Sequence, residues 1–251
     1  MKDNYIIKNG VRFLTKEQDS FSEAYTKVRE IEGRILTNEA VKRLPYPLIK
    51  NKNYQEWQLR QKSTERFISY LKNLNTSVSI LDIGCGNGWF TNLMATVSLN
   101  NKVIGLDVSI IELEQAARVF NAENMKFVYG DLFKIKEEFE NKFDIIIMNA
   151  CVQYFPDFEA LLLQLKAFLK PNGEVHIIDS PFYNPSEIEA AKKRTTAYYK
   201  SVDVSDMSAN YFHHSKEKIK EFEVLYSPSK SFFRKIVDKK DSPFMWLRLR
   251  Y

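Results

Sequence analysis

The 251-residue sequence contains only two cysteines, Cys85 and Cys151, and only three histidines. Neither cysteine belongs to a Cys-x-x-Cys pair or lies near clustered histidines, so we expect neither a disulfide framework nor a metal site. No run of about 18 uncharged apolar residues occurs, and the first ten residues lack the apolar stretch of a secretory signal. We therefore expect a cytoplasmic protein with no membrane partner.

Charge is unevenly distributed along the chain. The formal charge is +6 for residues 1–75, −6 for residues 76–180 and +5 for residues 181–251. Two basic ends could steer an anionic substrate or a nucleic acid towards a cleft. The alternative, that Lys-rich helix faces are simply solvated, stays open.

The first fifty residues have local signals of their own. Asn9-Gly10 lies between two apolar-rich halves in 5–14, which predicts a hairpin. Apolar residues at helical spacing predict a helix over 20–36, and a second helix is expected over 54–74. We interpret 1–50 as an amino-terminal extension, a hairpin plus a helix, packed on a main domain formed by residues 51–251.

From Val78 onward, apolar runs of strand length alternate with helical patterns. The runs are "VSILDIG", "KVIGLDV", "MKFVYGD", "FDIIIMNA" and "EVHIIDS". This alternation predicts an α/β fold with a doubly wound, mostly parallel sheet, because parallel strands need crossover helices on both faces. "FEVLYSP" and "PFMWLRLRY" lack a crossover helix between them. We expect them to form an antiparallel edge pair at the carboxyl terminus, which completes a seven-stranded sheet.

Three glycines, Gly84, Gly86 and Gly88, cluster in "ILDIGCGNG" at the end of the first of these strands. Ligands of doubly wound sheets bind at such strand ends, and glycine permits positive φ and close approach. A dinucleotide site would have Gly-x-Gly-x-x-Gly, whereas this spacing is one residue shorter. The carboxylate of Asp82 would also repel a diphosphate, whereas it would attract a cation such as S-adenosylmethionine, which carries an ammonium and a sulfonium.

"LDIGCGNG" resembles the first motif of class I S-adenosylmethionine-dependent methyltransferases, and the similarity continues over about residues 76–180. It implies a Rossmann-like fold, S-adenosyl-L-methionine as cofactor and S-adenosyl-L-homocysteine as product. In that family the acid that ends the second strand binds the ribose, and an acid after the third strand meets the adenine. The end of the fourth strand faces the methyl donor. The resemblance thus implies these cofactor-binding residues: Asp82, Gly84, Cys85, Gly86, Gly88, Asp107, Val108, Asp131, Leu132 and Asn149.

Candidates for the acceptor side lie outside those motifs. A neutral imidazole can remove a proton from a hydroxyl, so His213 and His214 are candidate catalytic bases, with a surface or structural role as the alternative. Tyr54, Trp57 and Arg60 share one side of a helix and either line a lid or form a core stripe. Tyr183 either faces the substrate or simply packs in the protein. The resemblance implies that Gln153, in the fourth-strand motif, lies near the methyl donor on the substrate side.

We expect a methyltransferase that moves a methyl group directly, in line, to a small-molecule acceptor. An RNA or protein methyltransferase that uses the basic flanks is one alternative. A module that binds S-adenosylmethionine without catalysis is another. The sequence does not select the acceptor, the attacking atom or the oligomeric state.

Overall fold

The computed structural model describes residues 5–17, 19–228 and 241–251, and only the backbone of residues 19–21. Its strands form one nine-stranded sheet in the order β1-β2-β5-β4-β3-β6-β7-β9-β8. All pairings from β2 through β7 are parallel, and β9 is antiparallel to both β7 and β8. The doubly wound sheet with an antiparallel edge pair is confirmed. The sheet has nine strands rather than seven because the hairpin over 5–14 joins it, with β2 pairing to β5.

The elements follow one another along the chain as strands β1 Ile6–Lys8 and β2 Val11–Phe13; helices α1 Asp19–Ile31, α2 Asn38–Val41 and α3 Tyr54–Asn73; then β3 Ser79–Ile83, α4 Trp89–Val97, β4 Lys102–Asp107, α5 Ile110–Val119, β5 Met125–Tyr129, α6 Lys136–Phe139, β6 Phe143–Asn149, α7 Phe158–Phe168, β7 Leu169–Ile178, α8 Ile188–Ser201, β8 Glu223–Tyr226 and β9 Trp246–Arg250. Short 3-10 helices include η2 Val152–Tyr154 and η4 Ser205–Asn210. Helix α1 ends at Ile31, short of the predicted 36, because Gly33 takes a left-handed conformation (φ 67°).

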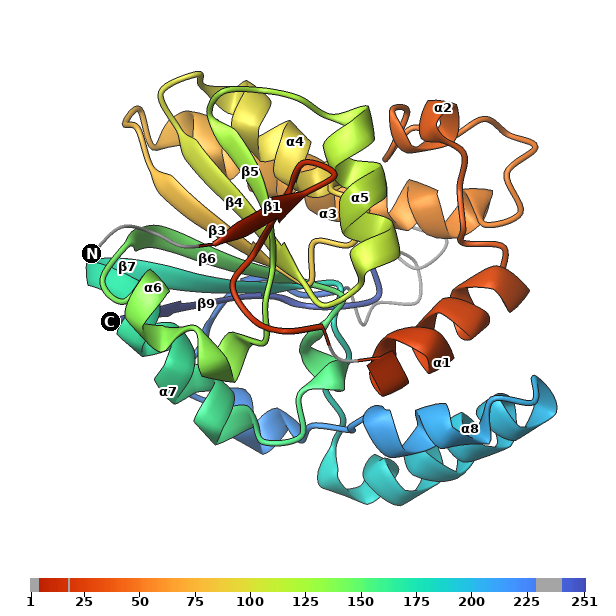
Figure 1. Ribbon diagram of the computed structural model, residues 1–251. Helices are drawn as coiled ribbons and strands as arrows, with labels where there is room; N and C mark the ends of the chain where they lie inside the picture. The colour runs from red at the N-terminus through yellow and green to blue at the C-terminus, as the bar shows by residue number, and fades with distance from the viewer. Residues whose placement is uncertain (1–4, 18, 229–240) are drawn as a thin grey trace.

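Both faces of the sheet are buried, which explains the nearly continuous apolar strands. Successive side chains of β3 pack into the hydrophobic cores on opposite faces of the sheet. Ile80 packs with α3, α4 and α5, and Leu81 packs with α6 and α7. Figure 1 shows these helices in layers on the two sides of the sheet. No helix in the described ranges is long and apolar enough to cross a membrane.

A third, smaller core joins segments that are distant in sequence. Val28 of α1 packs with Tyr199 of α8 and Met207 of η4. The Tyr198 hydroxyl donates to Glu32 Oε1 at 2.6 Å, and Lys27 Nζ donates to the carbonyl of Asp203 at 2.9 Å. Figure 1 shows α1 and α8 side by side, off one end of the sheet. They form a cap beside the carboxyl ends of the strands.

Strand register brings three chain positions together under this cap. Ile83 pairs with Met148 and Asn149 pairs with Ile178, so β3, β6 and β7 end side by side. Adjacent strands lie about 4.8 Å apart. The glycine loop after β3, Asn149 and Asp179 therefore lie within about two strand spacings of one another.

Candidate cofactor and acceptor site

A cavity of about 690 Å³ lies where these strand ends meet the cap. Its wall combines the glycine loop, the end of β6, one side of α3 and the facing sides of α1 and α8. The lining residues include Tyr25, Arg29, Glu32, Arg34, Glu56, Trp57, Arg60, Asp82, Gly84, Cys85, Gly86, Asn87, Glu112, Asn149, Ala150, Gln153, Tyr154, Asp179, Arg194, Thr195, Tyr198, Tyr199, Tyr211 and Ser242.

The three clustered glycines all have left-handed backbones, with φ of 68°, 53° and 74° at Gly84, Gly86 and Gly88. A Cβ at Gly84 would lie 2.7 Å from Cys151 Cβ, and one at Gly88 would lie 2.5 Å from the Phe127 ring. The first and third glycines are therefore required by the turn and by close packing inside the protein. Gly84 and Gly86 line the cavity, whereas Gly88 does not.

Asp82 is a buried carboxylate on the cavity wall. It is 1% exposed, and its Oδ2 accepts a 2.6 Å hydrogen bond from the Thr91 hydroxyl. Burial and the nearby charge of Asp107 together raise the pKa of Asp82 to about 7, against the Thr91 hydrogen bond, which lowers it. A cation in the cavity would relieve this cost.

Asp107, at the end of β4, organises the glycine loop. Its carboxylate accepts backbone N–H bonds from Gly86 (2.8 Å), Val108 (2.7 Å) and Ser109 (2.8 Å). Burial and the neighbouring Glu112 raise the pKa of Asp107 to about 6. Neither Asp107 nor Val108 lines the cavity, but Glu112 does, and its Oε1 accepts a 2.9 Å hydrogen bond from Arg29.

Asp131 and Leu132 lie outside the cavity wall. The Asp131 carboxylate accepts the backbone N–H of Phe133 at 3.1 Å and pairs with Lys134 at 2.9 Å. Leu132 is buried in the core beneath α6 and α7. In this conformation both residues have partners inside the protein.

Three buried amide oxygens on the wall lack partners: Asn87 Oδ1, Asn149 Oδ1 and Gln153 Oε1. Buried polar atoms are normally hydrogen-bonded, so unpaired acceptors around a cavity mark places for a ligand's donors. Together with Asp82 they form an acceptor-rich wall. Such a wall fits the ammonium of S-adenosylmethionine and suits its sulfonium.

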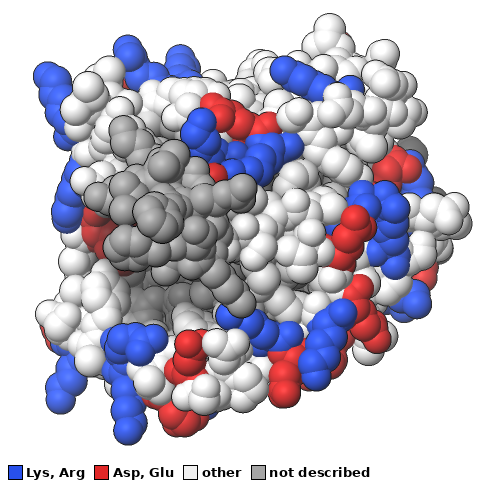
Figure 2. Space-filling model, turned by 180° about the vertical axis from the view of Figure 1, so that it is seen from behind, with Lys and Arg blue, Asp and Glu red and all other residues white. Residues whose placement is uncertain are grey.

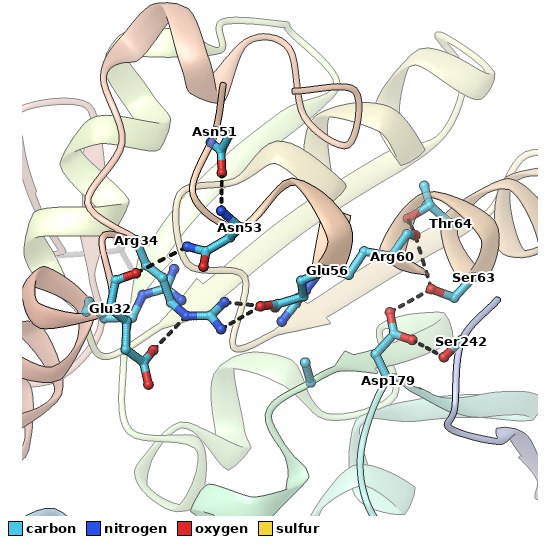
Figure 3. Close-up of polar contacts among 12 residues, drawn as sticks. Glu32, Arg34, Asn51, Asn53, Glu56, Arg60, Ser63, Thr64, Asp179 and Ser242 are labelled. Atoms are coloured by element: carbon cyan, nitrogen blue, oxygen red, sulfur yellow. Dashed lines mark hydrogen bonds and ion pairs between the residues drawn. The ribbon is translucent and has the colours of Figure 1, made fainter. Parts of the chain in front are cut away.

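A row of charged side chains crosses the other side of the cavity (Figure 3). Arg34 bonds Glu32 Oε2 at 2.6 Å and Glu56 Oε1 at 2.8 Å, and Arg60 Nε bonds Glu56 Oε1 at 2.9 Å. Burial opposes ionisation of Glu56, but the two guanidiniums outweigh it and lower its pKa to about 2. The row ties the end of α1 to the start of α3.

Asp179 ends this row on the β7 side. Its oxygens accept hydrogen bonds from the Ser63 hydroxyl at 2.6 Å and the Ser242 hydroxyl at 2.8 Å. Burial raises the pKa of Asp179, opposed by Arg60 and both hydroxyls. Asp179 is thus a carboxylate on the cavity wall that accepts a proton more readily than an ordinary Asp does.

The acceptor-side candidates differ in whether they line the cavity. Trp57, Arg60 and Gln153 line the cavity, whereas Tyr54 and Tyr183 do not. His213 is one contact behind the wall, because its Nε2 lies 2.9 Å from the hydroxyl of the lining residue Thr195. His214 is buried, with Nε2 3.3 Å from the carbonyl of Val152.

Tyr25 and Arg29 of the cap, Glu112 of α5 and Asp179 just after β7 were not singled out from the sequence. Tyr25 and Arg29 share a helix face at i, i+4, but that spacing cannot tell which distant element the face meets. The thiols of Cys85 and Cys151 are buried, and burial raises their pKa values, so neither resembles an activated nucleophile. No group of three or more potential metal ligands occurs among the described residues.

A family model described as a methyltransferase domain matches residues 74–232, well over half of the chain. The chain belongs to this methyltransferase domain family. A demethylmenaquinone methyltransferase of Lactococcus lactis is 32% identical over 131 residues. The match covers 51% of this chain and 50% of that protein. A malonyl-[acyl-carrier protein] O-methyltransferase of Halalkalibacterium halodurans is 35% identical over 98 residues, covering 38% and 36% of the two chains. The matches thus span half or less of these curated relatives.

The fold resembles a solved methyltransferase over nearly its full length. The magnesium protoporphyrin IX methyltransferase of Synechocystis PCC 6803, solved with bound S-adenosylhomocysteine, aligns with a TM-score of 0.53 at 15% identity. The alignment covers 90% of this chain and 98% of the Synechocystis protein. At this identity the likeness establishes the shared fold alone.

Proposed function

We propose that this protein is an S-adenosylmethionine-dependent methyltransferase that acts on a small-molecule acceptor. The observation that carries the proposal is the cavity at the ends of β3, β6 and β7, where buried Asp82 faces the same space as three unpaired amide oxygens. A nucleotide diphosphate would be repelled there, whereas a sulfonium and an ammonium would be attracted. A cytoplasmic location accords with this proposal.

When bound, the cofactor would supply an electrophilic methyl group. Asp82, Gly84, Gly86 and Asn149 would hold its amino-acid end, and Asp107, which fixes the glycine loop, would meet the ribose after a local adjustment of Tyr25 and Arg29. Asp131 and Leu132 would meet the adenine. The cap of α1 and α8 would exclude water.

The acceptor would enter between α3 and α8, beside Trp57, Arg60 and Tyr211. Where its attacking atom carries a proton, Asp179 is placed on the wall to accept it, one strand spacing from the end of β6. His213 could take part only through Thr195. The named acceptors of the relatives differ from one another, so they select no acceptor for this chain.

A macromolecular acceptor is the second candidate, because the chain has two basic ends. Against it, acidic and basic side chains interleave along the right-hand side of the face in Figure 2, where no field of one sign forms. No separate RNA-binding motif accompanies residues 191–200.

Mass spectrometry of a metabolite extract incubated with the protein and S-adenosylmethionine tests the proposal. We expect S-adenosylhomocysteine to accumulate together with a small molecule heavier by one methylene. Accumulation only after RNA or protein is added would favour the macromolecular alternative. Cofactor binding without any turnover would favour a non-catalytic module.

A further inference from the structure

Exposed apolar side chains gather in two segments of the described chain, residues 5–7 and residues 31–49. Fourteen large apolar residues are exposed in the described part of the chain, and five of them lie within residues 31–49. These five are Ile31, Ile35, Tyr46, Leu48 and Ile49, here called the apolar strip. Ile49 is 81% exposed, and Tyr46 and Leu48 are 55% and 54% exposed. Soluble surfaces rarely gather such residues without a partner.

Polar contacts hold the two halves of the strip together. Leu48 forms a turn with Asn51, whose backbone N–H bonds the Leu48 carbonyl at 2.9 Å. The next residue, Lys52, donates to the carbonyl of Ile31 at 3.3 Å, and Asn53 donates to that of Glu32 at 3.3 Å. Residues 48–53 therefore lie against residues 31–33, and the strip is one surface.

The strip is bordered by exposed cations. Lys42, Arg43 and Lys50 have exposed side chains, and the charge of Lys42 acts on Glu39 nearby. Residues 31–52 contain five Lys or Arg and two Glu, so the segment is net basic. Apolar tips between exposed cations match the two layers of an anionic bilayer surface, acyl chains below and phosphates above.

The same segment forms part of the cavity wall. Glu32 and Arg34 line the cavity and stand in sequence between Ile31 and Ile35 of the strip. Any surface that covers the strip would therefore lie beside the rim of the cavity.

We propose that residues 31–52 dock the protein on an anionic phospholipid surface, with Tyr46, Leu48 and Ile49 entering the interface. From sequence we expected no membrane partner, because only spanning segments were sought. A protein partner or a second copy could use the apolar residues, but the exposed cations and the net basic charge of the segment favour anionic phospholipid. This docking goes beyond the proposed reaction and does not depend on it.

Co-sedimentation of the full chain with vesicles tests the proposal. We expect binding to vesicles of phosphatidylglycerol and phosphatidylcholine in equal parts, weak binding to phosphatidylcholine alone, and a decline as salt rises. Each Lys near an anionic surface contributes about fivefold to partitioning, so loss of two should weaken binding about 25-fold, and Lys42→Glu/Lys50→Glu, which also reverses the charges, by at least that much. Leu48→Ser/Ile49→Ser should weaken it to a similar degree.

Matched controls lie near the amino ends of the strands, away from the cavity. Leu99→Ser removes an apolar residue that is 85% exposed, and Lys72→Glu/Lys126→Glu reverses two other exposed charges. Neither should change vesicle binding, and thermal unfolding should show all variants folded. Absence of binding to the mixed vesicles at low salt, or equal losses in the controls, would overturn the proposal. So would a wild-type dimer that Leu48→Ser/Ile49→Ser makes monomeric without any effect on vesicles.

Discussion

Asp82 lowers the stability of the folded protein at neutral pH. Its pKa is about 7 in the folded state against 3.8 for an ordinary Asp, so the folded state binds the proton more tightly than the unfolded state. Stability therefore falls as pH rises from about 4 to about 7, by at most ~4 kcal/mol from this group. A buried carboxylate that lowers stability at a cavity wall is typical of a group that binds a ligand.

Asp82→Asn should accordingly stabilise the protein at pH 8 and change little at pH 4. The Asn carbonyl can still accept from Thr91, so the main change is loss of the buried charge. Denaturant unfolding at the two pH values measures this. Destabilisation at pH 8 would mean that the carboxylate is held by favourable contacts within the protein.

Binding of S-adenosylmethionine should release protons at pH 6 to 7. A cation next to Asp82 lowers its pKa, so a carboxyl that is partly protonated in the free protein becomes ionised in the complex. Affinity should then rise with pH up to about 7. Calorimetry in buffers of different ionisation enthalpy counts the protons.

Asp82→Asn is the informative variant for that count, with Asp144→Asn as its control, because Asp144 bonds Ser79 and Lys170 near the amino ends of the strands, away from the cavity. Proton release should shrink in the first variant and persist in the second. Equal release in both would assign the protons to another group.

At the scale of elements, the start of α4 depends on Gly88. This residue precedes the helix in a left-handed conformation, and a Cβ there would overlap the Phe127 ring and approach Ala116 Cβ at 2.7 Å. The glycine therefore allows α4 to pack closely on β5.

Gly88→Ala should cost ~3 kcal/mol of unfolding free energy, from the strained backbone and the overpacked core together. Gly130→Ala is the control, since Gly130 is not left-handed and its added Cβ would come no closer than 3.3 Å to a side-chain methyl group. Urea unfolding of both variants measures the difference. Equal, small losses would show that α4 can shift to admit the methyl group.

Local patterns were sufficient to predict most elements but not their distant partners. The strands from β3 to β7 and the glycine loop were predictable because each is specified within a few residues. The hairpin was also predicted, yet its pairing with β5 depends on side chains more than a hundred residues away. The same holds for Val28 against Tyr199. The amino-terminal helices and residues 181–215 were expected around the acceptor, but neither the contact of α1 with α8 nor the place of Tyr25, Arg29 and Arg34 on the cavity wall was predicted.

Asp179 shows the limit for single residues. In sequence it is one acid after an apolar strand, like Asp107. Its role on the wall arises from Ser63 and Ser242, which come from α3 and from the segment before β9. Spacing along the chain carries no signal for such a cluster.

At the scale of the whole molecule, the cavity is closed by segments from both ends of the chain. Helices α1 and α8 meet through a small core and a few polar contacts, far fewer than those that hold the central sheet. A ligand beneath them would link the sheet to the cap. S-adenosylhomocysteine should therefore slow amide exchange in α1 and in the glycine loop, while β6 and β7 change little.

That expectation is measured by hydrogen exchange with and without S-adenosylhomocysteine. NAD serves as the control ligand, since its diphosphate does not suit Asp82. Protection by NAD in the same segments, or protection confined to β8 and β9, would place the ligand elsewhere.

We propose that the cavity over Asp82 and the glycine loop binds S-adenosylmethionine. Isothermal titration of the protein with S-adenosylmethionine, S-adenosylhomocysteine and NAD tests it most directly. We predict saturable binding of the first two, weakened at least tenfold in Asp82→Asn, and no binding of NAD. Tight binding of NAD with no response to the other two ligands would contradict the claim.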